Sequence, residues 1–84
     1  MNKIDSIKRK IIYRSEYRGI KEMDLILSAF IKKYLNSLNY DELLDLKEIL
    51  ENDDDLIFKW YSGRITSGIK ETRVSNLLKN FKLD

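Results

Sequence analysis

The residues best able to recognise a charged partner lie in one short stretch, Arg18-Gly19-Ile20-Lys21-Glu22-Met23-Asp24. We call residues 18–24 the charged corner, because they fall between two stretches of helical pattern. They contain both signs of charge, and Gly19 is the only glycine in the first sixty residues. A turn that holds side chains of opposite charge close together either just ends one helix and starts the next, or forms a recognition surface. The residues alone leave both interpretations open.

The composition argues against most enzyme classes. The chain has no cysteine and no histidine, which removes thiolate nucleophiles, the usual general base near neutral pH and the commonest zinc ligands. The three glycines are scattered and form no phosphate-binding loop. Asp53-Asp54-Asp55 lacks the spaced ligands and the central glycine of a calcium loop. We therefore expect a chain that is not an enzyme, with no catalytic residue, no metal site and no stably bound cofactor of its own.

Charge is spread unevenly along the chain, although the net charge is only +2. Residues 1–22 carry seven basic and three acidic side chains, whereas residues 39–59 carry two basic and eight acidic ones. Such polarity can steer a charged partner, or it can simply reflect solvated helix faces. The basic side chains near the N-terminus form a stripe that could neutralise phosphates: Lys8, Arg9, Lys10, Arg14, Arg18 and Lys21.

A small nucleic-acid-binding module that uses the basic first helix is therefore an alternative function. The near-neutral charge of the whole chain and the lack of a recognition-helix pattern count against it. We expect no nucleic-acid partner.

Length and hydropathy bound the class of protein. A chain of 84 residues forms one small domain, which buries only about 60% of the surface that its unfolded form exposes. No apolar run reaches the length of about 18 residues typical of a membrane-spanning helix. Met1 to Asp5 reads neither as a secretory signal nor as a transit peptide. We therefore expect no membrane association and a reducing location, the cytoplasm of a bacterium.

Hydrophobic periodicity predicts helices and no strands, because no alternating apolar pattern persists. The expected helices cover residues 5–17, 20–37, 40–51, 56–61 and 69–81. They predict an all-α fold, a compact bundle of about five short helices in a single domain spanning residues 1–84.

Local residue types predict where these helices begin and end. Asp5 is a candidate N-cap of the first helix, and Gly19 is suited to end it in the left-handed conformation. Asn39 and Glu42 are spaced as a capping box at the start of the third helix. The aspartates at 53–55 would place carboxylates at the positive end of the fourth.

The charged corner and the order of helices together resemble a known family. Arg18-Gly19-x-x-Glu22 resembles the RGxxE motif of the small FAD assembly factors of succinate dehydrogenase, the flavinator family. The resemblance covers residues 7–64 and continues through three later segments: the apolar helix 25–34, the capped acidic start Asn39-Tyr40-Asp41-Glu42, and Asp53-Asp54 with Phe58-x-Trp60. This chain has Asp55 where the family commonly has a proline.

The resemblance implies an assembly factor, or chaperone, without catalytic activity. It implies binding to the flavoprotein subunit of succinate dehydrogenase, or also that of fumarate reductase, and promotion of covalent FAD attachment to a histidine of that subunit. FAD would then be held by the partner flavoprotein, since this chain has no histidine to act as acceptor. We expect the chain itself to be a monomer.

The resemblance also implies which residues contact the partner: Arg18, Gly19 and Glu22, with Asp24, Tyr17 and Lys21 in the same patch. The planar, permanently charged guanidinium of Arg18 could engage a carboxylate or the charged surroundings of a flavin. Gly19 would let two backbones approach closely. Glu22 could pair with Arg18 or accept a basic side chain of the partner.

Overall fold

The computed structural model describes residues 2–16 and 18–83, and within these ranges all regular structure is helical. The elements are α1 (Lys3–Ser15), α2 (Lys21–Tyr34), the 3-10 turn η1 (Leu35–Ser37), α3 (Tyr40–Leu50), α4 (Asp54–Tyr61) and α5 (Arg73–Asn80). The predicted all-α bundle of five short helices is confirmed. None of the described helices has the length and hydropathy needed to cross a bilayer.

α1 begins and ends earlier than the sequence pattern predicts. Its N-cap is Asn2, whose Oδ1 accepts a hydrogen bond from the backbone N–H of Asp5 at 2.8 Å, so the prediction that Asp5 is the cap was wrong. At the other end, the Ser15 hydroxyl donates to the carbonyl of Ile12 at 2.7 Å, and the chain turns extended at Glu16. The Ser15 hydroxyl and the Glu16 N–H thus satisfy carbonyl groups at the end of α1, so this end needs no glycine C-cap.

Gly19 therefore does not end α1, and this prediction was also wrong. The helix stops at Ser15, well before the glycine. The glycines with positive φ among the described residues are Gly63 (83°) and Gly68 (98°), both in the segment between α4 and α5. Among the described glycines, only these two have a backbone conformation that favours glycine. The reason for a glycine at position 19 must lie elsewhere.

The predicted capping box of α3 is present. Asn39 Oδ1 accepts from the Glu42 N–H at 2.9 Å, and Glu42 Oε1 accepts from the Asn39 N–H at 3.0 Å. A second capping box, which the sequence reading missed, starts α5: Thr72 and Ser75 exchange the equivalent bonds. Because this capping box forms the start of α5, the helix begins at Arg73, four residues later than predicted.

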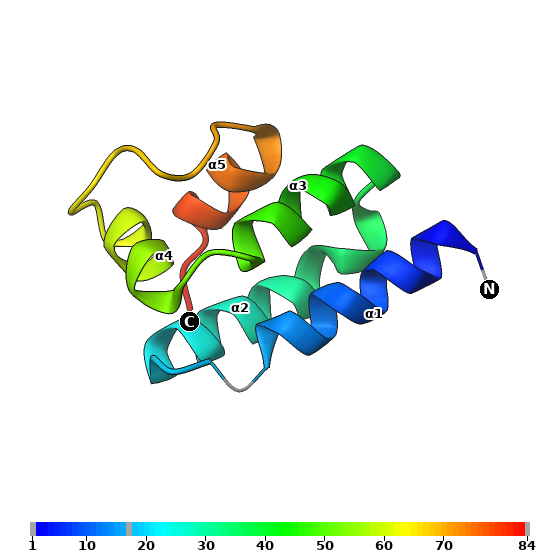
Figure 1. Cartoon of the computed structure of the whole chain (residues 1–84), viewed down its shortest axis with the longest axis horizontal. Helices are drawn as coiled ribbons and strands as arrows, with labels where there is room; N and C mark the ends of the chain where they lie inside the picture. The colour runs from blue at the N-terminus through cyan, green and yellow to red at the C-terminus, as the bar shows by residue number, and fades with distance from the viewer. Residues whose placement is uncertain (1, 17, 84) are drawn as a thin grey trace.

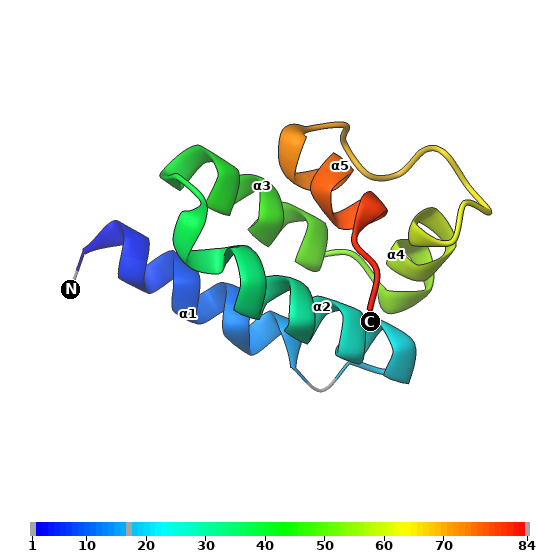
Figure 2. The ribbon, with the colours of Figure 1, turned by 180° about the vertical axis from the view of Figure 1, so that it is seen from behind.

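α2 supplies a large part of the hydrophobic core. Met23, Leu27 and Phe30 on this helix are fully buried. α1 packs against both α2 and α3, α4 lies near the start of α2, and α5 packs against α3 and α4 (Figures 1 and 2). The chain after α5 returns towards α2, where the ring of Phe81 meets the ring of Phe30 edge-on at 5.5 Å. This packing brings the charged corner beside the turn between α3 and α4.

Candidate docking surface

The side chain of Arg18 is used inside the protein. Only 10% of it is exposed, and its Nε forms an ion pair with Asp54. Nη1 donates to the carbonyls of Arg14 at 2.8 Å and Leu50 at 3.0 Å, and Nη2 donates to the carbonyl of Asn52 at 2.9 Å. The guanidinium therefore joins the C-terminal ends of α1 and α3 to the start of α4.

Asp54 completes this arrangement from the first turn of α4. One carboxylate oxygen takes the bond from Arg18, and the other accepts the backbone N–H of Ile20 at 3.0 Å. Its side chain is 15% exposed and lies in the first turn of α4, at the positive end of the helix dipole. A single carboxylate thus fixes both the arginine and the backbone just before α2.

Sequence reasoning placed Asp54 only as a helix-start residue and missed its link to Arg18. The two residues are 36 positions apart, and no local spacing signals a contact over that distance. The available signal was the Asp53-Asp54 pair within the family resemblance, which marked the position without revealing its role. The contact of Arg18 with the Asn52 carbonyl, 34 positions away, was missed for the same reason. The side-chain amide of Asn52 also donates, locally, to the carbonyls of Glu48 at 3.3 Å and Ile49 at 3.1 Å.

Gly19 lies exposed at the surface directly above Asp54. A Cβ built on this glycine would meet Asp54 Oδ2 at 3.4 Å, an ordinary van der Waals distance, and the backbone is not in the left-handed region. The fold would therefore accept a small side chain here. A side chain would nevertheless cover the Arg18–Asp54 pair and raise the surface at that point. Close approach by a second protein is a better physical reason for glycine than backbone strain.

The remaining predicted residues occupy the first turn of α2. Lys21 and Glu22 are exposed, and Asp24 is half-buried with its backbone N–H bonded to the carbonyl of Ile20 at 3.0 Å. Within the described parts of the chain, Arg18 pairs with Asp54 and not with Glu22, so the predicted internal Arg18–Glu22 pair is not formed. Glu22 is left accessible to a partner. Tyr17 lies outside the described residues.

A shallow depression of about 560 Å³ adjoins Gly19. We call it the corner depression, and it is lined by Tyr13, Arg14, Glu16, Arg18, Gly19, Leu50, Glu51, Asn52, Asp53 and Asp54. The Tyr13 side chain stands at its edge and is 77% exposed. A hydrogen bond from Lys47, at 2.6 Å, is the main cause that lowers the pKa of Glu51, so this carboxylate stays charged at neutral pH. An open, charged hollow with a projecting tyrosine suits a protein partner.

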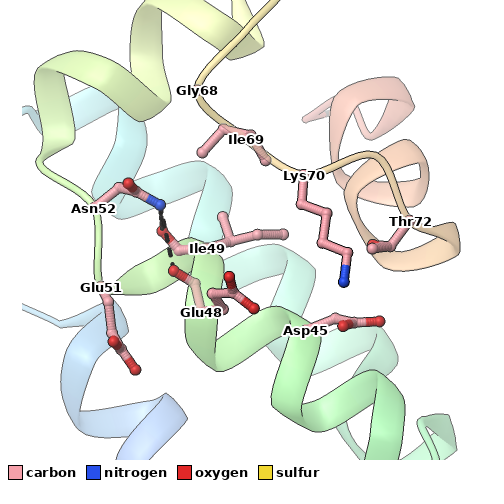
Figure 3. Close-up of a pocket in the computed structure, with 9 residues that line it drawn as sticks. All are labelled: Asp45, Glu48, Ile49, Glu51, Asn52, Gly68, Ile69, Lys70 and Thr72. Atoms are coloured by element: carbon pink, nitrogen blue, oxygen red, sulfur yellow. Dashed lines mark hydrogen bonds between the residues drawn. The ribbon is translucent and has the colours of Figure 1, made fainter.

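A smaller hollow of about 230 Å³ lies on another side of α3 (Figure 3). It is lined by Asp45, Glu48, Ile49, Glu51, Asn52, Gly68, Ile69, Lys70 and Thr72. In Figure 3, Lys70 points across the hollow towards Asp45, and the Asn52 amide turns back onto the end of α3. Asn52 and Glu51 border both this hollow and the corner depression, so the α3–α4 turn forms the ridge between them.

Comparison with curated proteins finds relatives among fungal assembly factors. A Debaryomyces hansenii protein named succinate dehydrogenase assembly factor 2, mitochondrial, is 34% identical over 80 residues, which are 95% of this chain and 54% of the relative. The protein of that name from Saccharomyces cerevisiae strain S288c is 35% identical over 80 residues, 95% of this chain and 47% of the relative. That from Scheffersomyces stipitis is 47% identical over 55 residues, 64% of this chain and 37% of the relative.

These relatives correct the expected location. The prediction of a bacterial cytoplasm is contradicted, since the relatives are mitochondrial proteins of fungi. The absence of cysteine and of long apolar runs fits any reducing aqueous compartment. Composition therefore could not distinguish a bacterial cytoplasm from a mitochondrial location. The chain spans about half the length, or less, of the relatives described above.

The family model described as flavinator of succinate dehydrogenase matches residues 9–82. No solved structure gives a match. The matched range includes the whole charged corner, the α3–α4 turn that holds Arg18, and α5. On the strength of this match and of the relatives, the chain belongs to the flavinator family of succinate dehydrogenase.

Proposed function

We propose that this protein is a non-catalytic assembly factor that binds the flavoprotein subunit of succinate dehydrogenase and promotes covalent attachment of FAD to it. Family membership supports the connection with succinate dehydrogenase. The mitochondrial names of the relatives support a mitochondrial setting. The observation that carries the docking site is that Arg18 and Asp54 together hold an exposed glycine and the start of α2 in one fixed arrangement.

Residues of the charged corner then take two different roles. Arg18 and Asp54 are positioning residues, because their charged groups bond to each other and to the backbone of the protein. Gly19, Lys21 and Glu22 are exposed and available to contact the flavoprotein. This division replaces the expectation that the Arg18 guanidinium reaches the partner. It also explains why the corner needs an arginine, since lysine has no planar set of donors for a carboxylate and three carbonyls.

The mechanism we infer is positioning. FAD and the acceptor histidine both belong to the flavoprotein, since this chain has no histidine. A rigid docking surface that orders the flavoprotein around FAD would bring the flavin and the histidine into reactive geometry, and correct positioning alone can accelerate a reaction greatly. The chain would act in this way as a monomer, with succinate dehydrogenase as its main client and fumarate reductase as a second.

Co-expression with a succinate dehydrogenase flavoprotein tests the proposal. We expect flavin fluorescence that survives denaturing electrophoresis to rise when the wild-type chain is present. Gly19→Arg and Gly19→Leu should abolish the rise, because either side chain holds the partner away from the corner. Gly19→Leu adds bulk without offering Asp54 a second cation. Circular dichroism should show that both variants keep the helical fold.

Ser67→Arg provides the matched control, since it adds the same side chain at an exposed position in the segment between α4 and α5. Its covalent flavin signal should equal that of the wild type. The proposal fails if covalent flavin is the same with and without the wild-type chain. Unfolding of both Gly19 variants would make the glycine a structural requirement and would remove the argument for docking at this point.

A further inference from the structure

A groove runs between α1 and α3. It consists of two adjoining hollows of about 540 Å³ and 500 Å³, which share Lys10 and Lys47. We call their combined lining the basic groove: Asn2, Lys3, Ser6, Ile7, Arg9, Lys10, Tyr13 and Arg14 from the N-terminal region, with Tyr40, Leu44 and Lys47 from α3. Neither hollow is part of the charged corner.

The lining of the basic groove combines positive charge with apolar surface. Among the described residues, the lining includes five basic side chains and no carboxylate. Among the cations, Lys3 and Lys10 are exposed, whereas Lys47 already pairs with Glu51 at 2.6 Å. Between the charges lie apolar surfaces that water still reaches, with Leu44 41% exposed and Tyr40 38% exposed. A ligand that fits must supply negative charge and apolar groups together.

The basic groove is continuous with the corner depression. Tyr13 and Arg14 line both, so one surface leads from Gly19 to the groove without interruption. Figure 1 shows α1 running beside α3 from the corner towards the N-terminal end of the chain. α1 has 13 residues, a length of about 20 Å, which would accommodate a short peptide segment.

We propose that the basic groove binds an acidic segment with apolar side chains from the same flavoprotein that docks at the charged corner. The identity of the partner rests on the proposed function, but the groove's preference for an acidic peptide rests on its own lining. Positive side chains facing a negative segment would steer association, and Tyr13, Tyr40 and Leu44 would bury apolar side chains. The partner would then be recognised at two adjoining places.

A nucleic acid fits this surface less well than an acidic peptide. The groove is short, and acidic side chains border both ends of α3, including Glu51 and Asp53 in the corner depression. A polyanion longer than the groove would run onto these carboxylates, which repel phosphate. The net charge of +2 gives no general attraction for a polyanion. A peptide can end where the positive lining ends.

Binding to the purified flavoprotein subunit, measured by calorimetry or anisotropy at two salt concentrations, tests the groove. Lys10→Glu reverses a groove charge, and Lys32→Glu is the matched control on an exposed lysine of α2 outside the groove. We expect Lys10→Glu to weaken binding about fivefold at low salt and to reduce its salt dependence, because groove charges act through steering. Lys32→Glu should bind as the wild type does.

A second pair of variants tests the apolar part. Leu44→Ser should weaken binding, whereas Leu83→Ser, at a similarly exposed leucine outside the groove, should not. Wild-type binding by Lys10→Glu and Leu44→Ser, together with loss of binding by Gly19→Arg, would overturn the groove proposal and leave the proposed function intact. Absence of any binding by the wild-type chain would overturn both. Lys10-dependent binding to a random oligonucleotide, with flavoprotein binding unchanged, would show a nucleic acid as occupant and refute the peptide.

Discussion

At the scale of single residues, Arg18 is a motif residue whose charged group bonds within the protein and is not offered to a partner. A guanidinium that is 10% exposed loses much of its hydration, and this loss is offset by an ion pair and three bonds to carbonyls. Each of those carbonyls lies at or just beyond the end of a helix, where intrahelical donors are lacking. The arginine therefore supplies donors to helix ends and fixes their relative positions at the same time.

Removing the carboxylate that faces Arg18 should destabilise the whole domain. Asp54→Asn leaves a largely buried guanidinium without its counter-ion, and we expect a loss of about 2 kcal/mol in the free energy of unfolding, less than for a fully buried pair. Urea unfolding followed by circular dichroism measures it. Glu51→Gln is the control, because its pair with Lys47 is exposed to solvent and should contribute little to stability. Equal stability of Asp54→Asn and the wild type would contradict the positioning role.

At the scale of elements, the sequence predicts helices well and their ends less well. The apolar periodicity of α2 and the capping box of α3 are local features, and both were read correctly. α1 starts at Lys3 because Asn2 caps it, and the pattern of isoleucines does not distinguish an asparagine cap at position 2 from an aspartate cap at position 5. α5 starts late because Thr72 and Ser75 cap it, although Ile69 already packs into the core.

Acid should weaken the start of α3. The bond from the Asn39 N–H is the main cause that lowers the pKa of Glu42 below its ordinary value of 4.5, and Arg73 adds to the effect. Because the folded pKa lies below the unfolded one, the charged carboxylate stabilises the fold above about pH 4.5, and this contribution is lost as the pH falls through the folded pKa. Protonation would also end the ion pair with Arg73.

Unfolding free energies of the wild type and Glu42→Gln, measured from neutral pH down to about pH 3, test this linkage. The wild type should be the more stable at neutral pH, and the difference should shrink towards zero at the acid end. Glu71→Gln, which removes an exposed carboxylate outside any capping box, controls for net charge. A difference that stays constant over the whole range would show that ionisation of Glu42 contributes nothing.

At the scale of the whole molecule, the fold class could be predicted from the sequence. The location of the docking site stays a prediction, and the contacts that hold residues 18–24 in place could not be predicted at all. Residues 18–24 were identified because they are neighbours in sequence. Their support comes from Leu50, Asn52 and Asp54, more than thirty positions from Arg18, and is created only when α4 packs near α2. The basic groove likewise joins α1 to α3, so it exists only in the folded chain.

The C-terminal segment provides the last test at this scale, because it ties together parts of the chain that carry the site. The ring of Phe81 lies 5.5 Å from that of Phe30 and 6.3 Å from that of Tyr34, and its carbonyl accepts the Tyr61 hydroxyl. Phe81→Ala should cost about 2 kcal/mol, less than for a fully buried ring because Phe81 is half-buried. For a domain of this size, the loss corresponds to a fall of about 10 °C in Tm.

The covalent flavin yield of Phe81→Ala should equal that of the wild type well below its lowered Tm, because no residue of the corner or the groove is changed. Phe81→Leu, which keeps apolar volume without the aromatic edge, should recover more than half of the lost stability. Thermal unfolding by circular dichroism and the electrophoretic flavin assay separate the two effects. Loss of flavin yield in a variant that is still folded would show that the C-terminal segment belongs to the docking surface and does not merely support it.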